Sequence, residues 1–188
     1  MFTKGGNMAV VRQLDKLKTW LETEICPQFK FKQADDKNVD ITYPYELVNP
    51  NVFIMYVPPK ELIGEANRVP SICIQLEDGS ESMAEASGVL NLRLQFATFN
   101  PGEHTEEDFK INTEGWRDVW NFVDYIMRKI RDTELIDDLR IVKENGIKYG
   151  PISDQGQIPN FYPYYFAWMS FSVEYGIQSS KAQIRELL

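Results

Sequence analysis

Residues 89–99, VLNLRLQFATF, alternate between apolar and polar side chains. Successive side chains of an extended chain point to opposite faces, so this alternation predicts a β-strand with one apolar face. The apolar set is Leu90, Leu92, Leu94 and Phe96, and the polar set is Asn91, Arg93 and Gln95. We expect the first set to meet a core and the second to meet water or a partner.

Two segments outside this strand have the periodicity of amphipathic helices. In residues 8–26 the apolar stripe is Val10, Leu14, Leu17, Leu21 and Ile25, and in residues 113–131 it is Trp116, Val119, Trp120, Val123, Met127 and Ile130. Asn7 and Thr113 are the expected N-caps, and Pro27 is expected to end the first helix. We expect Trp116 and Trp120 to hold the second helix against the core.

The remaining apolar segments read as strands. Strand-length apolar or alternating patterns cover residues 52–57, 71–76 and 165–175, and residues 135–150 read as two short strands around Asn145-Gly146. Asp78-Gly79 reads as a turn. Residues 77–88 and 100–112 are expected to be long loops.

This order of elements predicts an α+β fold. Consecutive strands joined by turns favour a mainly antiparallel sheet, and two amphipathic helices would pack on one of its faces. The length of 188 residues suits one domain spanning residues 1–188. Residues 1–7 are expected to form a flexible N-terminal arm, and residues 178–188 a C-terminal arm or short helix.

Composition narrows the possible functions. The formal net charge is −8, so specific nucleic-acid binding is not expected, since affinity for phosphate comes from clustered Lys and Arg. No run approaches 18 apolar residues, so no membrane span is expected. The two cysteines, Cys26 and Cys73, form no CxxC motif and favour a reducing compartment. Cys73 lies in an apolar run and reads as a buried thiol.

The single histidine, His104, lacks the partners that three kinds of reaction site need. His104-Thr105-Glu106 matches half of a zinc deaminase signature, but the PCxxC half is missing. One histidine cannot build a metal cage of several histidines, and no G-x-S-x-G elbow supports a catalytic triad. The expectation is therefore a surface histidine in an acidic loop, with no catalytic residue, no bound metal and no cofactor.

Carboxylates leave one enzymatic alternative open. Adjacent acidic residues on a strand point to opposite faces and rarely converge on one site. Distant partners could still combine as in a hydrolase or nuclease. The residues considered for this alternative are Glu77, Asp78, Glu106 and Asp108.

Three features together resemble a known family. They are the strand–turn–strand unit PSICIQLEDGS and VLNLRLQFATFNPGE, the helix start EGWRDVWNFVDYIMRKI, and the late aromatic strand in YGPISDQGQIPNFYPYYFAWMSFSVEYGI. The combination is similar to the tail terminator proteins of long-tailed bacteriophages, also called tail completion or minor tail proteins. The similarity covers roughly residues 52–177.

The resemblance implies a structural virion protein rather than an enzyme. Terminators of this family form an oligomeric ring, typically a hexamer, which caps the head-proximal end of the tail tube and stops its polymerisation. The implied partners are other copies of the chain, the major tail tube protein and a head-side connector protein, and DNA may pass through the ring. The implied location is the virion tail or neck, after assembly in the cytoplasm of the bacterial host. The alternatives are another neck or head-closure protein and, outside phages, a small binding or adaptor domain.

The expected interface combines the polar strand face with the two acidic loops. Its candidate residues are Glu77, Asp78, Asn91, Arg93, Gln95, His104, Glu106, Glu107 and Asp108.

Overall fold

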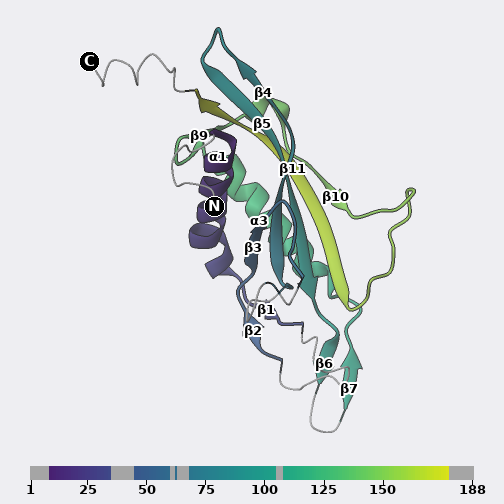
Figure 1. Cartoon of the computed structure of the whole chain (residues 1–188). Helices are drawn as coiled ribbons and strands as arrows, with labels where there is room; N and C mark the ends of the chain where they lie inside the picture. Colours follow the sequence, from purple (N-terminus) through teal and green to yellow (C-terminus); the bar gives the residue numbers. More distant parts are fainter. Residues whose placement is uncertain (1–8, 35–44, 60–61, 63–67, 105–107, 178–188) are drawn as a thin grey trace.

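The chain folds as a mixed sheet with its long helices on one face in a computed structural model (Figure 1). The structure describes residues 9–34, 45–59, 62, 68–104 and 108–177. The expected arms at residues 1–7 and 178–188, the proposed cap Asn7, and the site candidates Glu106 and Glu107 lie outside these residues. None of the described helices is both long and apolar enough to cross a membrane.

The elements follow one another along the chain in this order: α1 (Ala9–Trp20), η1 (Leu21–Ile25), η2 (Cys26–Gln28), β1 (Phe31–Lys32), β2 (Leu47–Val48), β3 (Asn51–Ile54), β4 (Ser71–Ser82), β5 (Ser87–Phe99), β6 (Gly102–His104), β7 (Phe109–Ile111), α3 (Trp116–Asp132), β8 (Leu135–Ile136), β9 (Leu139–Ile141), η3 (Lys143–Asn145), β10 (Lys148–Pro151) and β11 (Tyr164–Gly176). Here η1 is one π-helical turn that continues α1, and η2 and η3 are 3-10 turns.

The main sheet has seven strands in the order β3-β4-β5-β11-β9-β8, with β10 also paired to β11. Strand β11 pairs with β5 along its whole length, from Tyr164 opposite Phe99 to Gly176 opposite Ser87. The β3–β4 pair is parallel, and the other pairs in this sheet are antiparallel. The predicted α+β class with a mainly antiparallel sheet is therefore confirmed.

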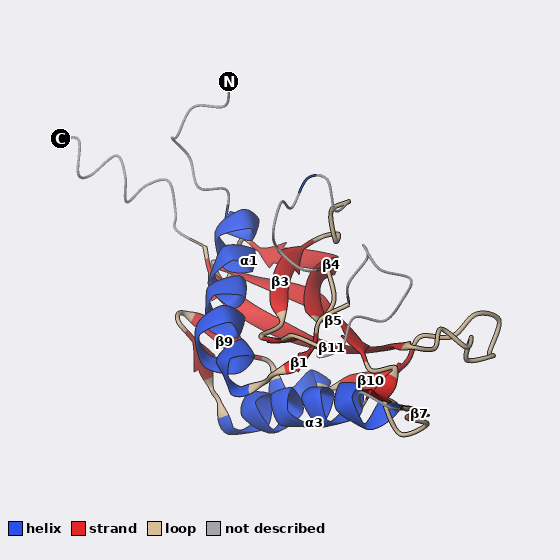
Figure 2. Cartoon of the chain, turned by 90° about the horizontal axis from the view of Figure 1, so that it is seen from below, coloured by secondary structure: helices blue, strands red, loops and turns tan. Residues whose placement is uncertain are grey.

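Both long helices pack on the same face of the sheet (Figure 2). The alternation in β5 buries Leu90, Leu92, Leu94 and Phe96, as predicted. The first helical stripe is also confirmed, because Leu14, Leu17, Leu21 and Ile25 are buried. The buried side chains of this sheet face and of both helices form one hydrophobic cluster.

The predicted stripe of α3 is only partly correct. Phe122 and Ile126 are fully buried, whereas Trp116 is 43% exposed and Trp120 is half-buried. Trp116 is the first residue of the helix. The rings of Phe29 and Phe31 pack against Phe122 rather than against Trp116. Thr113 is also not the N-cap; Gly115 has that place, and the Asn112 side chain accepts a hydrogen bond from the Glu114 N–H.

Residues 77–88 form the outer part of a β-hairpin rather than a loop. Asp78-Gly79 lies inside β4, just after a β-bulge at Glu77, and the chain turns at residues 83–86. Turn preference is local, and the long ladder with β5 overrides it here. We call residues 77–88 the hairpin arm; in Figure 1 the arm projects beyond the helices.

The predicted hairpin around Asn145-Gly146 is also corrected. The hairpin in this region joins β8 to β9 through Asp137 and Asp138, and Asp137 adopts a positive φ of 57°. Asn145 ends a 3-10 turn, and β9 and β10 both pair with β11 instead of with each other. Lys16 of α1 forms ion pairs with both aspartates, which ties the hairpin to the helix.

Two small sheets lie outside the main one. Strand β1 pairs with β2, and β6 pairs with β7, so residues 100–112 contain a short hairpin rather than only a loop. The ammonium group of Lys32 links the two small sheets by donating hydrogen bonds to Asn100 and to the carbonyl oxygen of Gly102.

Cys26 and Cys73 are both buried free thiols, as predicted for Cys73. Burial raises the pKa of Cys73 to about 11.

Candidate functional site

The helix-free face of the sheet is the candidate site. Its side chains come from the alternate positions of β5 and β11, which point away from the helices. Asn91, Arg93 and Gln95 lie opposite Ser172, Ser170 and Trp168, and all six are half-buried except the buried Ser172. The predicted polar face of residues 89–99 is therefore part of a wider surface made by two central strands.

Polar side chains in contact with their neighbours occupy the middle of this face, and we call them the polar network. The Arg93 guanidinium contacts Glu77 with an Nη2–Oε1 distance of 2.5 Å and lies 4.7 Å from the centre of the Trp168 ring. The bulge at Glu77 brings this carboxylate to the edge of the same face. Gln95 donates a hydrogen bond to Gln75 at 2.9 Å. The side chains of β4, β5 and β11 thus hold one another in fixed positions.

A second group of contacts, which we include in the polar network, lies toward the root of the hairpin arm. Asn91 Nδ2 donates to Asp78 Oδ1 at 2.6 Å, and Ser172 Oγ donates to Asn91 Oδ1 at 2.6 Å. Asn145 Nδ2 in turn donates to Ser172 Oγ at 3.0 Å. Carboxylate, amide and hydroxyl groups from four segments therefore form one continuous chain of hydrogen bonds.

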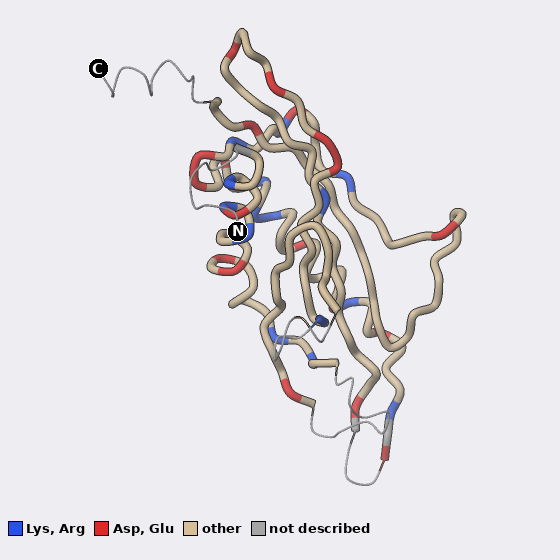
Figure 3. Tube along the Cα trace, viewed as in Figure 1, with Lys and Arg blue, Asp and Glu red and all other residues tan. Residues whose placement is uncertain are grey.

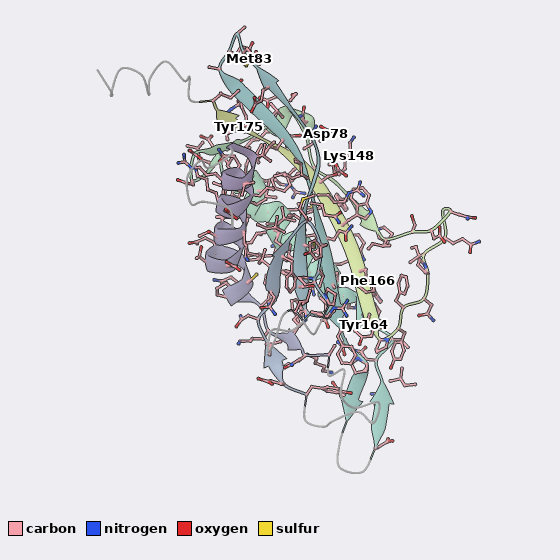
Figure 4. All side chains as sticks on the ribbon, viewed as in Figure 1. Asp78, Met83, Lys148, Tyr164, Phe166 and Tyr175 are labelled. Atoms are coloured by element: carbon pink, nitrogen blue, oxygen red, sulfur yellow. The ribbon has the colours of Figure 1, made fainter. Side chains whose placement is uncertain are left out.

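A polar cavity of about 350 Å³ lies beside this chain of hydrogen bonds. Its lining residues are Glu77, Asp78, Asn91, Asn145, Gly146, Lys148, Ser170, Phe171 and Ser172. Figure 4 shows Asp78 and Lys148 near the root of the hairpin arm. The lining offers hydrogen-bond donors, hydrogen-bond acceptors and side chains of both charges. This mixture suits the polar groups of a docked chain. Within the described residues, no group of three His, Cys, Asp or Glu side chains could hold a metal ion.

The structure divides the predicted site residues into two groups. Glu77, Asp78, Asn91, Arg93 and Gln95 come together in the polar network. His104 and Asp108 lie at the β6–β7 hairpin, at the opposite end of the sheet (Figure 1). The described carboxylates of the hydrolase alternative are accordingly far apart, with Glu77 and Asp78 at one end and Asp108 at the other.

Sequence reasoning missed the contributions of β11 and of the segment before β10. Trp168, Ser170 and Ser172 show the right alternation, but nothing local indicates that β11 pairs with β5. No sequence pattern indicates that Asn145 and Lys148 reach this face, because both were expected to belong to a separate hairpin. Pairing between strands that are distant in the chain is what assembles this site.

Aromatic side chains cover the other end of the face. Phe99 and Tyr164 have ring centroids 5.2 Å apart, and Phe161 and Phe166 have ring centroids 5.3 Å apart. Tyr164 and Phe166 are half-buried, and Phe161 is 46% exposed. This end of the surface is apolar, and such surfaces are enriched in protein interfaces.

Tyr175 fixes the root of the hairpin arm. Its side chain is 3% exposed, and its hydroxyl group donates a 2.8 Å hydrogen bond to Glu81. Burial, followed by the hydrogen bond to the Glu81 carboxylate, raises the pKa of Tyr175 to about 12. The neutral phenol is therefore part of the folded state.

This raised pKa predicts a loss of stability in alkali. The contribution of Tyr175 is complete below the ordinary tyrosine pKa of about 10 and is lost as the pH rises toward about 12, because the unfolded chain loses the proton first. Urea unfolding at several pH values between about 9 and 11.5 should show a smaller decline for Tyr175→Phe than for the wild type. Tyr149→Phe, at a 53% exposed position, should decline like the wild type. Equal declines in all three proteins would refute this assignment.

No protein-family model matches the chain, and a search of curated proteins finds no match.

Proposed function

We propose that this chain is a bacteriophage tail terminator, the subunit of a ring that caps the head-proximal end of the tail tube and offers the surface for joining the head. The proposal rests on the sequence resemblance and on one structural observation. That observation is a helix-free sheet face that carries both a polar network with a cavity and an aromatic end.

Such a face supports binding to a protein partner. The side chains of the network are already ordered by contacts with one another, so little conformational entropy is lost when a partner docks. The mixture of apolar rings, amides and paired charges is typical of a protein–protein interface. The partners in this proposal are neighbouring copies of the chain, the tail tube protein and a head-side connector protein.

Charge supports the same role. A ring around a DNA channel must let the duplex pass without holding it, and a subunit with a net charge of −8 repels phosphate on average. A ring also needs two different, complementary surfaces on each subunit, because a head-to-tail contact has to close on itself. The helix-free face supplies one such surface, and its complement has to lie elsewhere on the subunit.

Mass measurement tests the proposal directly. Light scattering coupled to size-exclusion chromatography should give a species of about six times the 21.9 kDa subunit mass, alone or in the presence of tail tube protein. Electron microscopy should show this species at one end of the tubes and should show shorter tubes when it is added during polymerisation. A chain that stays monomeric under both conditions contradicts the proposal. Binding only to a portal-side protein would assign the chain to another neck component.

A point variant links this activity to the helix-free face. Ser170 lines the cavity, so Ser170→Arg should place a bulky charged group in it and reduce capping of the tube at least about tenfold. Val11→Arg adds the same group at a 54% exposed position on α1 and should cap like the wild type. If both variants cap the tube as well as the wild type does, the helix-free face is not part of the interface.

A further inference from the structure

The hairpin arm is acidic and ends in an exposed methionine. Residues 77–88 contain Glu77, Asp78, Glu81 and Glu85 but no lysine or arginine. Figure 3 shows these acidic positions along the arm. Met83 lies in the turn at its tip and is 85% exposed (Figure 4). A flexible thioether side chain between two carboxylates is an unusual solvent-exposed group, and methionine adapts well to irregular apolar pockets.

An apolar pocket of about 270 Å³ lies elsewhere on the molecule, between the end of α3 and the segment that joins β9 to β10. Its lining residues are Ile130, Arg131, Ile141, Val142, Lys143, Gly146, Ile147, Tyr149 and Phe171. Arg131 and Lys143 are its charged members, and both are exposed cations. Within the described part of the chain, neither cation has a carboxylate in ion-pair contact.

The arm tip and the pocket match in size and in charge. The pocket volume of about 270 Å³ is ample for the four non-hydrogen atoms of a methionine side chain. Glu81 and Glu85 flank the methionine, as Arg131 and Lys143 flank the pocket. Charge-assisted hydrogen bonds between these pairs would fix the orientation of the tip.

The two features cannot meet within one copy of the chain. Phe171 lines the pocket, and Gly176 pairs with Ser87 just before the tip of the arm. The distance along β11 from Phe171 to Gly176 is roughly 17 Å, and the tip lies beyond that point. The arm points away from the body in Figure 4, so the tip is available to a neighbouring molecule.

We propose that Met83 of one copy inserts into the apolar pocket of the next copy, where Glu81 and Glu85 face Arg131 and Lys143. This inference rests on the proposed ring and names the contact that closes it. Arm and pocket are different surfaces, so the contact is head-to-tail and repeats around a ring. The contact also accounts for an exposed apolar tip on an otherwise acidic arm.

Two variants and their combination test this contact by sedimentation velocity. Met83→Asp should raise the dissociation constant of self-association at least about tenfold, because a buried methionine is replaced by a charge. The double variant Arg131→Glu/Lys143→Glu should weaken association similarly. Adding Glu85→Lys to that double variant should restore part of the affinity, since one charge pair is then exchanged while the hydrogen bond from Tyr175 to Glu81 stays in place. Circular dichroism and thermal unfolding establish that each variant is folded.

The control has the same change in net charge at other sites. Lys18→Glu/Arg117→Glu places two reversals outside the pocket and should associate like the wild type. If the wild type forms a ring, and Met83→Asp and Arg131→Glu/Lys143→Glu form it equally well, the proposed contact is overturned. The proposed ring itself would still stand. A wild-type chain that stays monomeric, alone and with tail tube protein, overturns the contact and the proposed function together.

Discussion

Replacement of Phe122 by alanine is expected to lower the free energy of unfolding by about 3 to 5 kcal/mol. Phe122 is fully buried, and its ring lies 4.7 Å from Phe29, 5.3 Å from Phe31 and 5.4 Å from Phe96, measured between centroids. These three rings belong to the segment after α1, to β1 and to β5, so Phe122 joins the second helix to three other segments of the fold. Loss of the Phe122 ring leaves a cavity that the neighbouring side chains cannot fill completely. Urea unfolding measures the change.

Trp116→Ala is the matched control on the same helix. Trp116 is 43% exposed, and its ring lies against the Arg117 guanidinium, 4.8 Å away, at the surface. Its removal should cost less than about half of the Phe122 effect, in spite of the larger side chain. A Trp116 variant that is the less stable of the two would contradict the assignment of the buried face of α3.

Gly88→Ala is expected to have the second-largest effect, a destabilisation of about 1 to 3 kcal/mol. A Cβ atom at this position would lie 2.6 Å from the Tyr175 hydroxyl oxygen and 2.7 Å from Cε1 of the same ring. The ring would have to move, and its hydrogen bond to Glu81 would break. Because that bond fixes the root of the hairpin arm, the proposed contact through Met83 predicts weaker self-association for this variant.

Gly176→Ala provides the control, since a Cβ added there meets no atom within 4 Å. Its stability should stay within about 1 kcal/mol of the wild type, the usual range for glycine in a strand. Combining Gly88→Ala with Tyr175→Leu tests the cause. If the clash with the ring is responsible, the two substitutions cost less together than the sum of their separate effects. Strict additivity would refute the clash.

The central strands and the helices were predictable because their signals are local. The alternation of residues 89–99 and 165–175 identifies β5 and β11, and it also identifies which side chains face the core. The stripe from Leu14 to Ile25 does the same for the first helix. In each case the period of the apolar residues matches the geometry of the element, and tertiary contacts agree with it.

The errors arise where distant residues decide the outcome. The choice between Trp116 and Phe122 depends on the rings of Phe29 and Phe31, which arrive from elsewhere in the chain. Asp78-Gly79 has the composition of a turn, but its backbone pairs with Asn91 and Leu90 of β5 instead. Local preferences are weaker than a continuous hydrogen-bonded ladder.

The candidate site was predictable only in part for the same reason. The alternation placed Asn91, Arg93 and Gln95 on one exposed face, and the structure confirms that placement. It could not show that Trp168 and Ser172 complete this face, because the β5–β11 register is a property of the folded chain. The apolar pocket at the end of α3 has no sequence signature, since α3, β11 and the segment between β9 and β10 build it together.

The position of β11 has a consequence for synthesis. It is the last of the described strands in the chain but a central strand of the sheet, with β5 on one side and β9 and β10 on the other. A ribosome must therefore deliver residues 164–176 before these three strands can share one sheet. Until then β5 presents a long unpaired edge to other nascent chains, so a chain that terminates before β11 is expected to be an aggregation-prone fragment.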